Sequence, residues 1–298
     1  MRVFLTGATG FIGSRIVPEL LAAGHQVLGL TRSNAGERTL AAMGAEAHRG
    51  DIEDLDSLRE GAAGADAVIH TAFDHDFSNF IANCDKDRRV IAALGSALKG
   101  SDRPLVITSA VGMGSNGPGA LATETTFDRD HPNPRIASEL AGARLSEAGV
   151  NVSVVRLPQV HDTVKQGLIS PLIELAREKG VSAYVSEGPT RWSAAPVTDV
   201  ATLYRLALEK AAPGSRYNAV AEEGVPMRDI AKAIADGLGV PVVSLSPEEA
   251  AGHFGWLTLF AGADMAASSV WTRETLGWNP TGPDLLSDLR AMDYSRAA

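Results

Sequence analysis

The stretch Thr6-Gly7-Ala8-Thr9-Gly10-Phe11-Ile12-Gly13 decides the fold of this 298-residue chain. It follows an apolar run at residues 3–5 and opens an amphipathic segment that predicts a helix over 11–23. In the spacing G-x-x-G-x-x-G, Gly7 permits a tight turn, Gly10 lets the backbone approach a pyrophosphate, and Gly13 lets the helix pack closely on the strand. The free N–H groups of the helix N-terminus attract the anion. The turn therefore predicts a dinucleotide site at Gly7, Thr9, Gly10, Phe11, Ile12 and Gly13.

The remainder of the first half alternates strand-like and helix-like segments. The strand-like runs lack polar alternation, which is typical of parallel strands buried on both faces. An alternation of strands and helices predicts an α/β fold, a Rossmann-type doubly wound parallel sheet with right-handed crossovers. Strands are predicted at 2–6, 26–30, 46–49, 67–71, 105–109 and 152–157, and helices at 11–23, 55–61, 77–99 and 136–148.

The rhythm loosens at Pro158, directly after the sixth predicted strand. We therefore predict a dinucleotide-binding domain over residues 1–158 and a smaller C-terminal substrate lobe over 159–298, interleaved with the last strands of the sheet. Helices are predicted at 169–179, 197–210, 227–238 and 247–260, with short apolar pieces at 217–220 and 240–245.

Composition excludes several classes of protein. A hydrophobic fraction of 45% and a charged fraction of 21% indicate a globular chain rather than a disordered one. The net charge of −9 disfavours a nucleic-acid partner, because an acidic surface repels phosphate backbones. Gly, Pro and charged residues interrupt the apolar runs well short of a membrane span. The strand at residue 2 leaves no room for a signal peptide, and Cys84, the only cysteine, cannot form an internal disulfide, so we expect a cytoplasmic protein.

The end of the second predicted strand bears on the choice of dinucleotide. NAD sites usually place a carboxylate there, but this chain reads Leu30-Thr31-Arg32-Ser33. Arg32 is suited to pair with a 2′-phosphate, and Ser33 to donate to it. The alternative is a solvated loop arginine. We therefore expect NADP(H) as the preferred cofactor, with NAD(H) as the second choice.

Two further strand ends contribute to the predicted cofactor site. Asp51 and Ile52, after the third strand, are placed to enclose the adenine, and Thr71-Ala72-Phe73, after the fourth, to pass under the pyrophosphate. The neighbouring group His70, Asp74, His75 and Asp76 lacks a recognised metal-ligand spacing, so we interpret it as structural or cofactor-lining.

With these residues the chain resembles the extended and atypical short-chain dehydrogenase/reductase superfamily, whose members include proteins labelled NAD-dependent epimerase/dehydratase. The resemblance spans nearly the whole chain and implies a Rossmann fold, a nicotinamide cofactor and a small-molecule substrate. Such labels follow the fold and say little about the substrate. Related folds commonly dimerise, so a homodimer is expected. Besides the glycine-rich turn, the matches are Gly50-Asp51-Ile52, Ile107-Thr108-Ser109, Val155-Arg156-Leu157-Pro158, Val197-Thr198-Asp199-Val200-Ala201 and residues 274–280.

The chain departs from the superfamily at its catalytic residues. Members usually carry a Ser or Thr after the fifth strand and a Tyr-x-x-x-Lys pair on the next helix. Ser109 holds the serine position, but Arg135 stands at the tyrosine position and Glu139 at the lysine position. Arginine stays protonated, so Arg135 suits the clamping of an oxyanion better than proton donation. Glu139 is expected to pair with Arg135 and accept a ribose hydroxyl; the alternative is an exposed helix ion pair.

Without the tyrosine, another group must supply a proton, and histidine is the usual candidate at neutral pH. His161 lies three residues past Pro158, where the superfamily brings the chain across the nicotinamide. His75 follows the fourth strand at the carboxyl edge of the sheet. His131 precedes the altered helix, and for each of the three the alternative is a surface loop histidine.

Three functions remain open. The first is NADP(H)-dependent hydride transfer to a small carbonyl, enone or imine, with Ser109, Arg135 and either His161 or His75 as catalytic residues. The second is a non-catalytic NADP(H) sensor that signals to a partner protein. The third, nucleotide-sugar epimerisation or dehydration, normally requires the missing tyrosine. The apolar stripe Trp256, Leu257, Leu259 and Phe260 is interpreted as core, pocket wall or dimer face.

Overall fold

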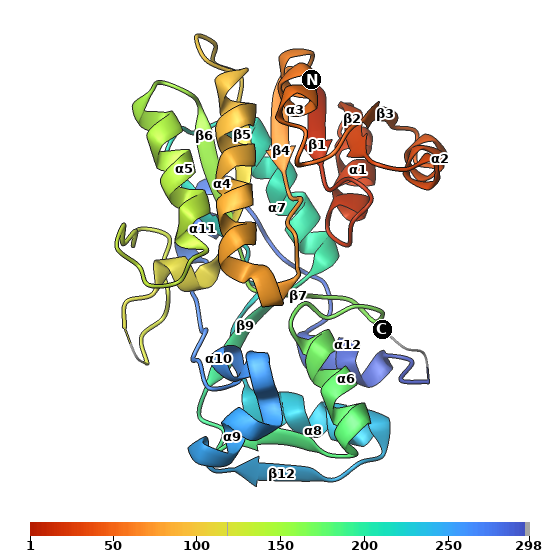
Figure 1. Ribbon diagram of the computed structural model, residues 1–298, viewed down its shortest axis with the longest axis vertical. Coiled ribbons are helices and arrows are strands. Elements are labelled where there is room, and N and C mark those ends of the chain that lie inside the picture. Colours follow the sequence, from red (N-terminus) through yellow and green to blue (C-terminus); the bar gives the residue numbers. More distant parts are fainter. Residues whose placement is uncertain (118, 296–298) are drawn as a thin grey trace.

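The computed structural model describes residues 1–117 and 119–295. Its centre is a seven-stranded sheet of order β10-β6-β5-β4-β1-β2-β3, in which every pair of neighbours is parallel (Figure 1). The predicted Rossmann-type doubly wound sheet is confirmed. The strands are β1 (Arg2–Thr6), β2 (Gln26–Thr31), β3 (Glu46–Arg49), β4 (Ala67–His70), β5 (Leu105–Ala110), β6 (Val152–Leu157) and β10 (Arg216–Asn218).

Strand β1 shows how the sequence builds two helical layers around the sheet. Successive side chains of a strand point to opposite faces. Val3 and Leu5 pack into the core beneath α1 (Gly13–Ala22) and α7 (Val197–Lys210). Phe4 packs into the core beneath α3 (Leu55–Ala63), α4 (Phe80–Ser96) and α5 (Ile136–Glu147) (Figure 1). Both faces are therefore covered, as the uninterrupted apolar strands predict.

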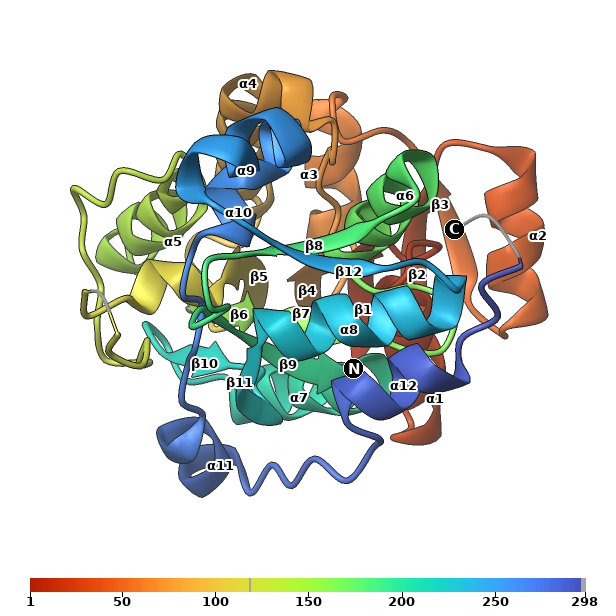
Figure 2. The same ribbon diagram turned by 90° about the horizontal axis from the view of Figure 1, so that it is seen from below.

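A smaller lobe lies below the carboxyl ends of the main sheet's strands (Figures 1 and 2). Its own core includes the buried Trp192, Phe254 and Leu257. A three-stranded sheet joins the lobe to the main sheet, because its central strand contributes Trp192 to the lower core and Ala195 to the upper one. The lobe contains α6 (Ile169–Lys179), β8 (Ser182–Val185), α8 (Met227–Leu238), β12 (Val242–Leu245), α9 (Pro247–Phe254), α10 (Thr258–Ala261) and α12 (Leu285–Ala291), and the joining sheet β7 (Gln159–His161), β9 (Arg191–Pro196) and β11 (Glu222–Pro226).

After residue 158 the chain passes more than once between the main sheet and the lower lobe. Helix α7 returns to cover the main sheet, and β10 adds its last strand beside β6. The short helix α11 (Val270–Leu276) then packs against α7 and β10. Among the described residues, no helix is both long and apolar enough to cross a membrane.

Two predicted helices are broken in the structure. The helix predicted over 77–99 starts as a separate 3₁₀ turn, η1 (Phe77–Asn79), because Asn79 leaves the helical conformation at φ −116° and ψ 29°. The helix predicted over 247–260 ends at Phe254, where Gly255 takes φ 55°, and continues as the 3₁₀ turn η3 (Gly255–Leu257) and α10. Helix α2 (Asn34–Ala42) was not predicted from the sequence. Ser33 is its N-cap, and the Ser33 side chain accepts from the Gly36 N–H.

Candidate active site

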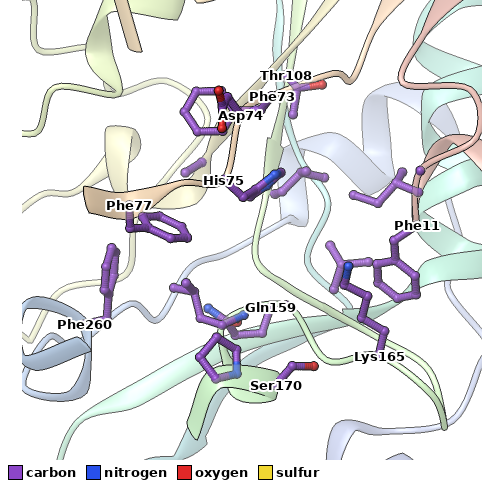
Figure 3. A pocket seen from close by; sticks show the side chains of 18 of the residues that line it. Phe11, Phe73, Asp74, His75, Phe77, Thr108, Gln159, Lys165, Ser170 and Phe260 are labelled. Carbon is purple, nitrogen blue, oxygen red and sulfur yellow. The ribbon is translucent and has the colours of Figure 1, made fainter. Parts of the chain in front are cut away.

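One large cleft, about 1870 Å³ in volume, lies between the carboxyl edge of the main sheet and the lower lobe. This exceeds the roughly 300–1,000 Å³ of a drug-sized pocket, so a dinucleotide and a substrate fit together. Figure 3 shows Phe11 and Lys165 at one end, which we name the cofactor end. Phe77 and Phe260 lie at the opposite end, the aromatic end, and His75 lies between them (Figure 3).

The glycine-rich turn has the geometry of a pyrophosphate cradle. Gly7 takes φ 72°, a conformation that favours glycine. A Cβ on Gly13 would lie 2.1 Å from the Gly7 carbonyl oxygen, so the close approach of turn and helix needs glycine there. Gly10 lines the cleft, and no side chain caps the start of α1, which leaves N–H groups for an anion. Thr9, Phe11 and Ile12 line the cleft beside it, and the whole turn fits a dinucleotide.

Arg32 and Ser33 lie at the end of β2, on the wall of the cleft. The Arg32 side chain is 79% exposed, and its Nη1 lies 3.6 Å from the Asp51 carboxylate. An exposed arginine next to the N-terminus of α2 suits a phosphate group. The other predicted cofactor residues that line the cleft are Ile52, Thr71, Ala72, Phe73 and Pro158.

Lys165 is a cleft residue that the sequence analysis missed. It lies in the loop after β7, with its ammonium 6.0 Å from the centroid of the Phe11 ring (Figure 3). The loop is tied to α1 by an ion pair between Arg15 and Asp162, 3.4 Å apart. This places a cation beside the glycine-rich turn. No local motif marks Lys165, because its position depends on how the lower lobe folds back toward α1.

Arg135 lines the cleft, but its partner is not the predicted one. Its Nη1 donates to the Asp87 carboxylate at 2.7 Å and to the Ser138 hydroxyl at 2.8 Å, while Nη2 donates to the Thr108 carbonyl at 3.0 Å. The guanidinium lies 4.1 Å from the centroid of the Phe73 ring. The predicted pair with Glu139 is wrong, because the buried carboxylate of α4 binds Arg135 instead.

Asp87 connects Arg135 to a buried chain of polar groups. Its other oxygen lies 2.9 Å from His70 Nε2, and His70 Nδ1 lies 2.7 Å from the Thr6 hydroxyl. Burial would raise the pKa of Asp87, but Arg135, His70 and Ser138 together lower it to about 2. An ionised carboxylate only accepts hydrogen bonds, so His70 donates from Nε2. The chain fixes Arg135 against the sheet from behind.

Glu139 requires a correction. It is fully buried, accepts from Arg156 Nε at 2.8 Å and Arg216 Nε at 2.9 Å, and is not among the cleft residues. Burial opposes ionisation, but these two arginines and Ser109 lower the pKa of Glu139 below its ordinary value. A carboxylate held in this way does not serve a ribose hydroxyl. The residue at the superfamily's lysine position is instead the centre of a buried ion-pair cluster.

The expected role of Ser109 changes for the same reason. Its side chain reaches the cleft wall, but its hydroxyl donates to Glu139 at 2.8 Å. The Ser109 hydroxyl proton that would bind a substrate oxygen is therefore already donated to Glu139. Ser109 links the cleft wall to the ion-pair cluster behind it.

His75 and His161, the two predicted proton donors, have opposite surroundings. His75 faces the cleft edge-on to Phe73, with ring centroids 5.3 Å apart. Partial desolvation and the charge of Arg135 lower the pKa of His75 below its ordinary value. His161 is fully buried, bonded through Nδ1 to Asp288 at 2.7 Å, and does not line the cleft. The prediction for His161 is therefore wrong, because α12 holds its ring inside the lower lobe. His131, which accepts from the Asn133 N–H, does not line the cleft either.

The aromatic end joins the two lobes across the cleft. Phe77 of η1 stacks on Trp256 of η3, with centroids 4.7 Å apart and planes at 13°. Phe260 meets Phe77 edge-on at 6.0 Å, and Phe80 adds a fourth ring at 5.6 Å from Phe77. Of the predicted apolar stripe, Trp256, Leu257 and Phe260 form the cleft wall, whereas Leu259 is 82% exposed.

Comparison with known proteins agrees with this architecture. Residues 3–219 match the model of the NAD dependent epimerase/dehydratase family. The chain belongs to this family. An uncharacterized protein of Schizosaccharomyces pombe is 46% identical over 99% of this chain and 100% of the relative. A 2-alkyl-3-oxoalkanoate reductase of Stenotrophomonas maltophilia is 29% identical over 82% of this chain and 77% of the relative.

Solved structures of the family show the same fold. The UDP-glucose 4-epimerase of Thermus thermophilus, in complex with NAD, aligns over 100% of both chains with a TM-score of 0.76 and 22% identity. Together with the family match, this supports a nicotinamide cofactor and an NAD(P)-binding, oxidoreductase-like fold for the present chain.

This epimerase/dehydratase-family chain has no described tyrosine on its cleft wall. Tyr204 of α7 is fully buried behind the cleft, where its hydroxyl lies 2.6 Å from Thr108 Oγ1 and burial raises its pKa. It therefore does not replace the tyrosine of Tyr-x-x-x-Lys. Within the ranges 1–117 and 119–295, no cluster of three or more His, Cys, Asp or Glu side chains forms a candidate metal site.

Proposed function

We propose that the protein is an NADP(H)-dependent oxidoreductase that reduces a small carbonyl compound, or a conjugated enone or imine. The observation that carries the proposal is the position of His75. Its imidazole lies between the cofactor end and the aromatic end of the cleft (Figure 3). A substrate bound between a cofactor and the aromatic rings would therefore lie beside His75. The printed activity of the Stenotrophomonas maltophilia relative, reduction of an oxoalkanoate, is of the same kind.

Residues of this chain suit the binding of the cofactor in an extended form. The glycine-rich turn and Lys165 would hold the pyrophosphate, Asp51 and Ile52 the adenine, and Arg32 the 2′-phosphate. A nicotinamide cofactor supplies a hydride when bound. Ala110, the last residue of β5, and Pro158, which follows β6, also line the cleft.

His75 completes the proposed reduction as the general acid. With the hydride that a bound nicotinamide would supply to the carbonyl carbon, the His75 imidazolium would donate its proton to the carbonyl oxygen, which receives the electron pair of the C–O π bond. The product is an alcohol, and His75 regains a proton from the water of the cleft. A lowered pKa makes His75 a stronger acid, at the cost of a smaller protonated fraction at neutral pH.

Arg135 contributes a fixed positive charge beside this reaction. Asp87, Ser138 and Thr108 hold its guanidinium in place, so the charge need not reorganise when negative charge develops on the substrate oxygen. Its influence reaches His75, whose pKa it lowers. We infer that Arg135 has replaced the tyrosine as an electrostatic residue and that His75 has taken over the proton.

A sensor without catalysis is the second candidate. It is favoured by the ion-pair cluster of Glu139, which commits two of the superfamily's catalytic positions, Ser109 and Glu139, to each other. A sensor has no use for the aromatic end, however, and this feature favours the enzyme.

The test is the oxidation of NADPH and NADH, followed by absorbance, over a panel of aldehydes, ketones, quinones, enones and imines. We expect turnover with NADPH, and a loss of about 10²–10⁴-fold in kcat for His75→Gln. The wild-type rate should fall as pH rises through the lowered pKa of His75, and the variant should lack this dependence. His161→Gln is the matched control, expected to keep its rate per folded molecule. Cofactor binding without turnover on any compound would favour the sensor instead.

A further inference from the structure

We propose that the substrate is a planar aryl carbonyl compound without anionic groups, bound with its ring against Phe77, Phe80, Trp256 and Phe260. The inference rests on the proposed function, because it names the compound whose carbonyl His75 would protonate. Nucleotide sugars are excluded as substrates under this proposal.

The first argument is the density of aromatic rings at one end of the cleft. Phe77 lies within 6.0 Å, centroid to centroid, of the three other rings. The stack of Phe77 on Trp256 is closed at 4.7 Å, so a substrate ring packs against the cluster and not inside it. Such a wall gains more from a planar ring than from a saturated one, since aromatic pairs contribute beyond their buried area.

The second argument is the distance from the wall to the proton donor. The His75 ring lies 6.2 Å from the Phe77 ring, which is within the range of one aromatic contact. A carbonyl bonded directly to a ring therefore reaches His75 while its ring remains on Phe77. A carbonyl on a long flexible chain would have to lose conformational freedom to make both contacts.

The third argument is charge. On the lower lobe, the described side chains of the cleft wall include three carboxylates, Glu174 (paired with Arg177), Glu178 and Asp293. The ammonium groups there are Lys165, at the cofactor end, and Lys179, which is the one beyond it among the described residues. A diphosphate beyond the cofactor would meet more negative than positive charge there. Arg191 lies on β9 of the joining sheet, next to Trp192. It is paired with Asp264 at 2.7 Å and does not line the cleft. Beyond the cofactor end, the residues of the lower cleft wall that the structure describes therefore form no cluster of arginine and lysine of the kind that recognises a diphosphate.

The arrangement also explains why two segments distant in sequence are both aromatic. Residues 73–80 follow β4 in the main domain, whereas residues 256–260 belong to the lower lobe. The wall needs both segments, since Phe77 of one stacks on Trp256 of the other. Trp256 remains 45% exposed even with Phe77 stacked on it. A ring bound in the cleft would bury more of both segments and join the two lobes.

The experiment compares 2-acetylnaphthalene with 2-acetyldecalin, which has the same skeleton in saturated form, and with UDP-glucose. Binding of each to the protein saturated with NADP⁺ is measured by calorimetry, so no turnover is needed. We expect the naphthyl ketone to bind at least tenfold tighter than the decalin ketone, and UDP-glucose not to bind. Phe77→Leu and Trp256→Leu should remove most of the tenfold preference. Trp271→Leu, which changes an exposed tryptophan away from the cleft, should retain it.

The outcomes separate this inference from the proposed function. Equal affinity for the two ketones, or tighter binding of UDP-glucose, would overturn the aryl assignment even if some carbonyl compound is reduced. Selective binding of the naphthyl ketone without its reduction by NADPH would support the aryl site and overturn the reductase. A variant that fails to fold is replaced by Phe260→Leu, whose ring touches both Phe77 and Trp256.

Discussion

The two ends of the cleft are built by different means. The cofactor end is built around backbone: a turn that requires glycine, the N-terminus of α1 and the carboxyl ends of parallel strands, to which side chains such as Lys165 are added. The aromatic end consists of side chains, contributed by η1 and η3 from opposite lobes. Backbone geometry survives most substitutions, whereas a wall of side chains changes with each one. The comparison explains how one family keeps its cofactor and varies its substrate.

The largest effect is expected behind the cleft wall, at the buried Asp87. Asp87→Ala leaves the guanidinium of Arg135 buried without its carboxylate and His70 without its acceptor. Removal of one partner of a buried ion pair typically costs about 3–5 kcal/mol. Chemical denaturation should show a loss of this size in the free energy of unfolding. A loss below about 1 kcal/mol would mean that Arg135 does not depend on Asp87.

Asp87→Asn provides the matched control, because it retains the shape and removes the negative charge, although one acceptor oxygen becomes an NH2 donor. The pKa of Asp87 lies at about 2 in the folded protein, below its ordinary value of 3.8. The stabilisation is therefore present above pH 3.8 and is lost as pH falls toward 2, a contribution on the order of 2 kcal/mol. The difference in unfolding free energy between wild type and Asp87→Asn should shrink over this interval. A difference independent of pH would contradict the assignment.

A smaller effect is expected at the cofactor end, where two glycines separate folding from binding. Gly13→Ala forces a Cβ to 2.1 Å from the Gly7 carbonyl oxygen and should destabilise the fold by about 1–3 kcal/mol. In Gly10→Ala the nearest atom lies 3.1 Å away, and the methyl group would be added at the cleft wall where the pyrophosphate is proposed to bind. We expect Gly10→Ala to keep a wild-type melting temperature and to bind NADPH at least tenfold more weakly. A parallel loss of stability and affinity in both variants would show that the two glycines share one role.

The same comparison separates what the sequence predicts from what it leaves open. The sheet, its strands and the cofactor end follow from local patterns: the glycine spacing marks the turn, and the apolar runs mark strands buried on both faces. Strands β1, β3 and β6 begin and end at the predicted residues. Local patterns suffice here because each strand and the turn are marked by adjacent residues, and the strand–helix alternation then implies a parallel sheet.

The catalytic residues depend on contacts between distant segments, and here prediction from the sequence fails. Helical spacing favours a pair between Arg135 and Glu139, but Asp87 and Arg156 approach from other elements and separate them. His161 is adjacent to the cleft along the chain, yet Asp288, 127 residues away, holds it in the lower core. The aromatic wall likewise requires η1 and η3 to meet, which neither segment encodes alone. These partners become visible only in three dimensions.

The smallest effect is expected at Arg32, at the edge of the cofactor end. It tests whether the protein prefers NADP(H) to NAD(H). Arg32 is exposed and only loosely paired with Asp51, so its removal should leave folding unchanged. A single arginine–phosphate contact at such a site is worth about tenfold in affinity. We expect Arg32→Ala to bind NADPH about tenfold more weakly and NADH with unchanged affinity, as measured by titration of cofactor fluorescence. Arg38→Ala, an exposed change on α2 five residues beyond the N-cap Ser33, serves as control. An equal loss for NADPH and NADH would place Arg32 at the pyrophosphate or the adenine, and not at the 2′-phosphate.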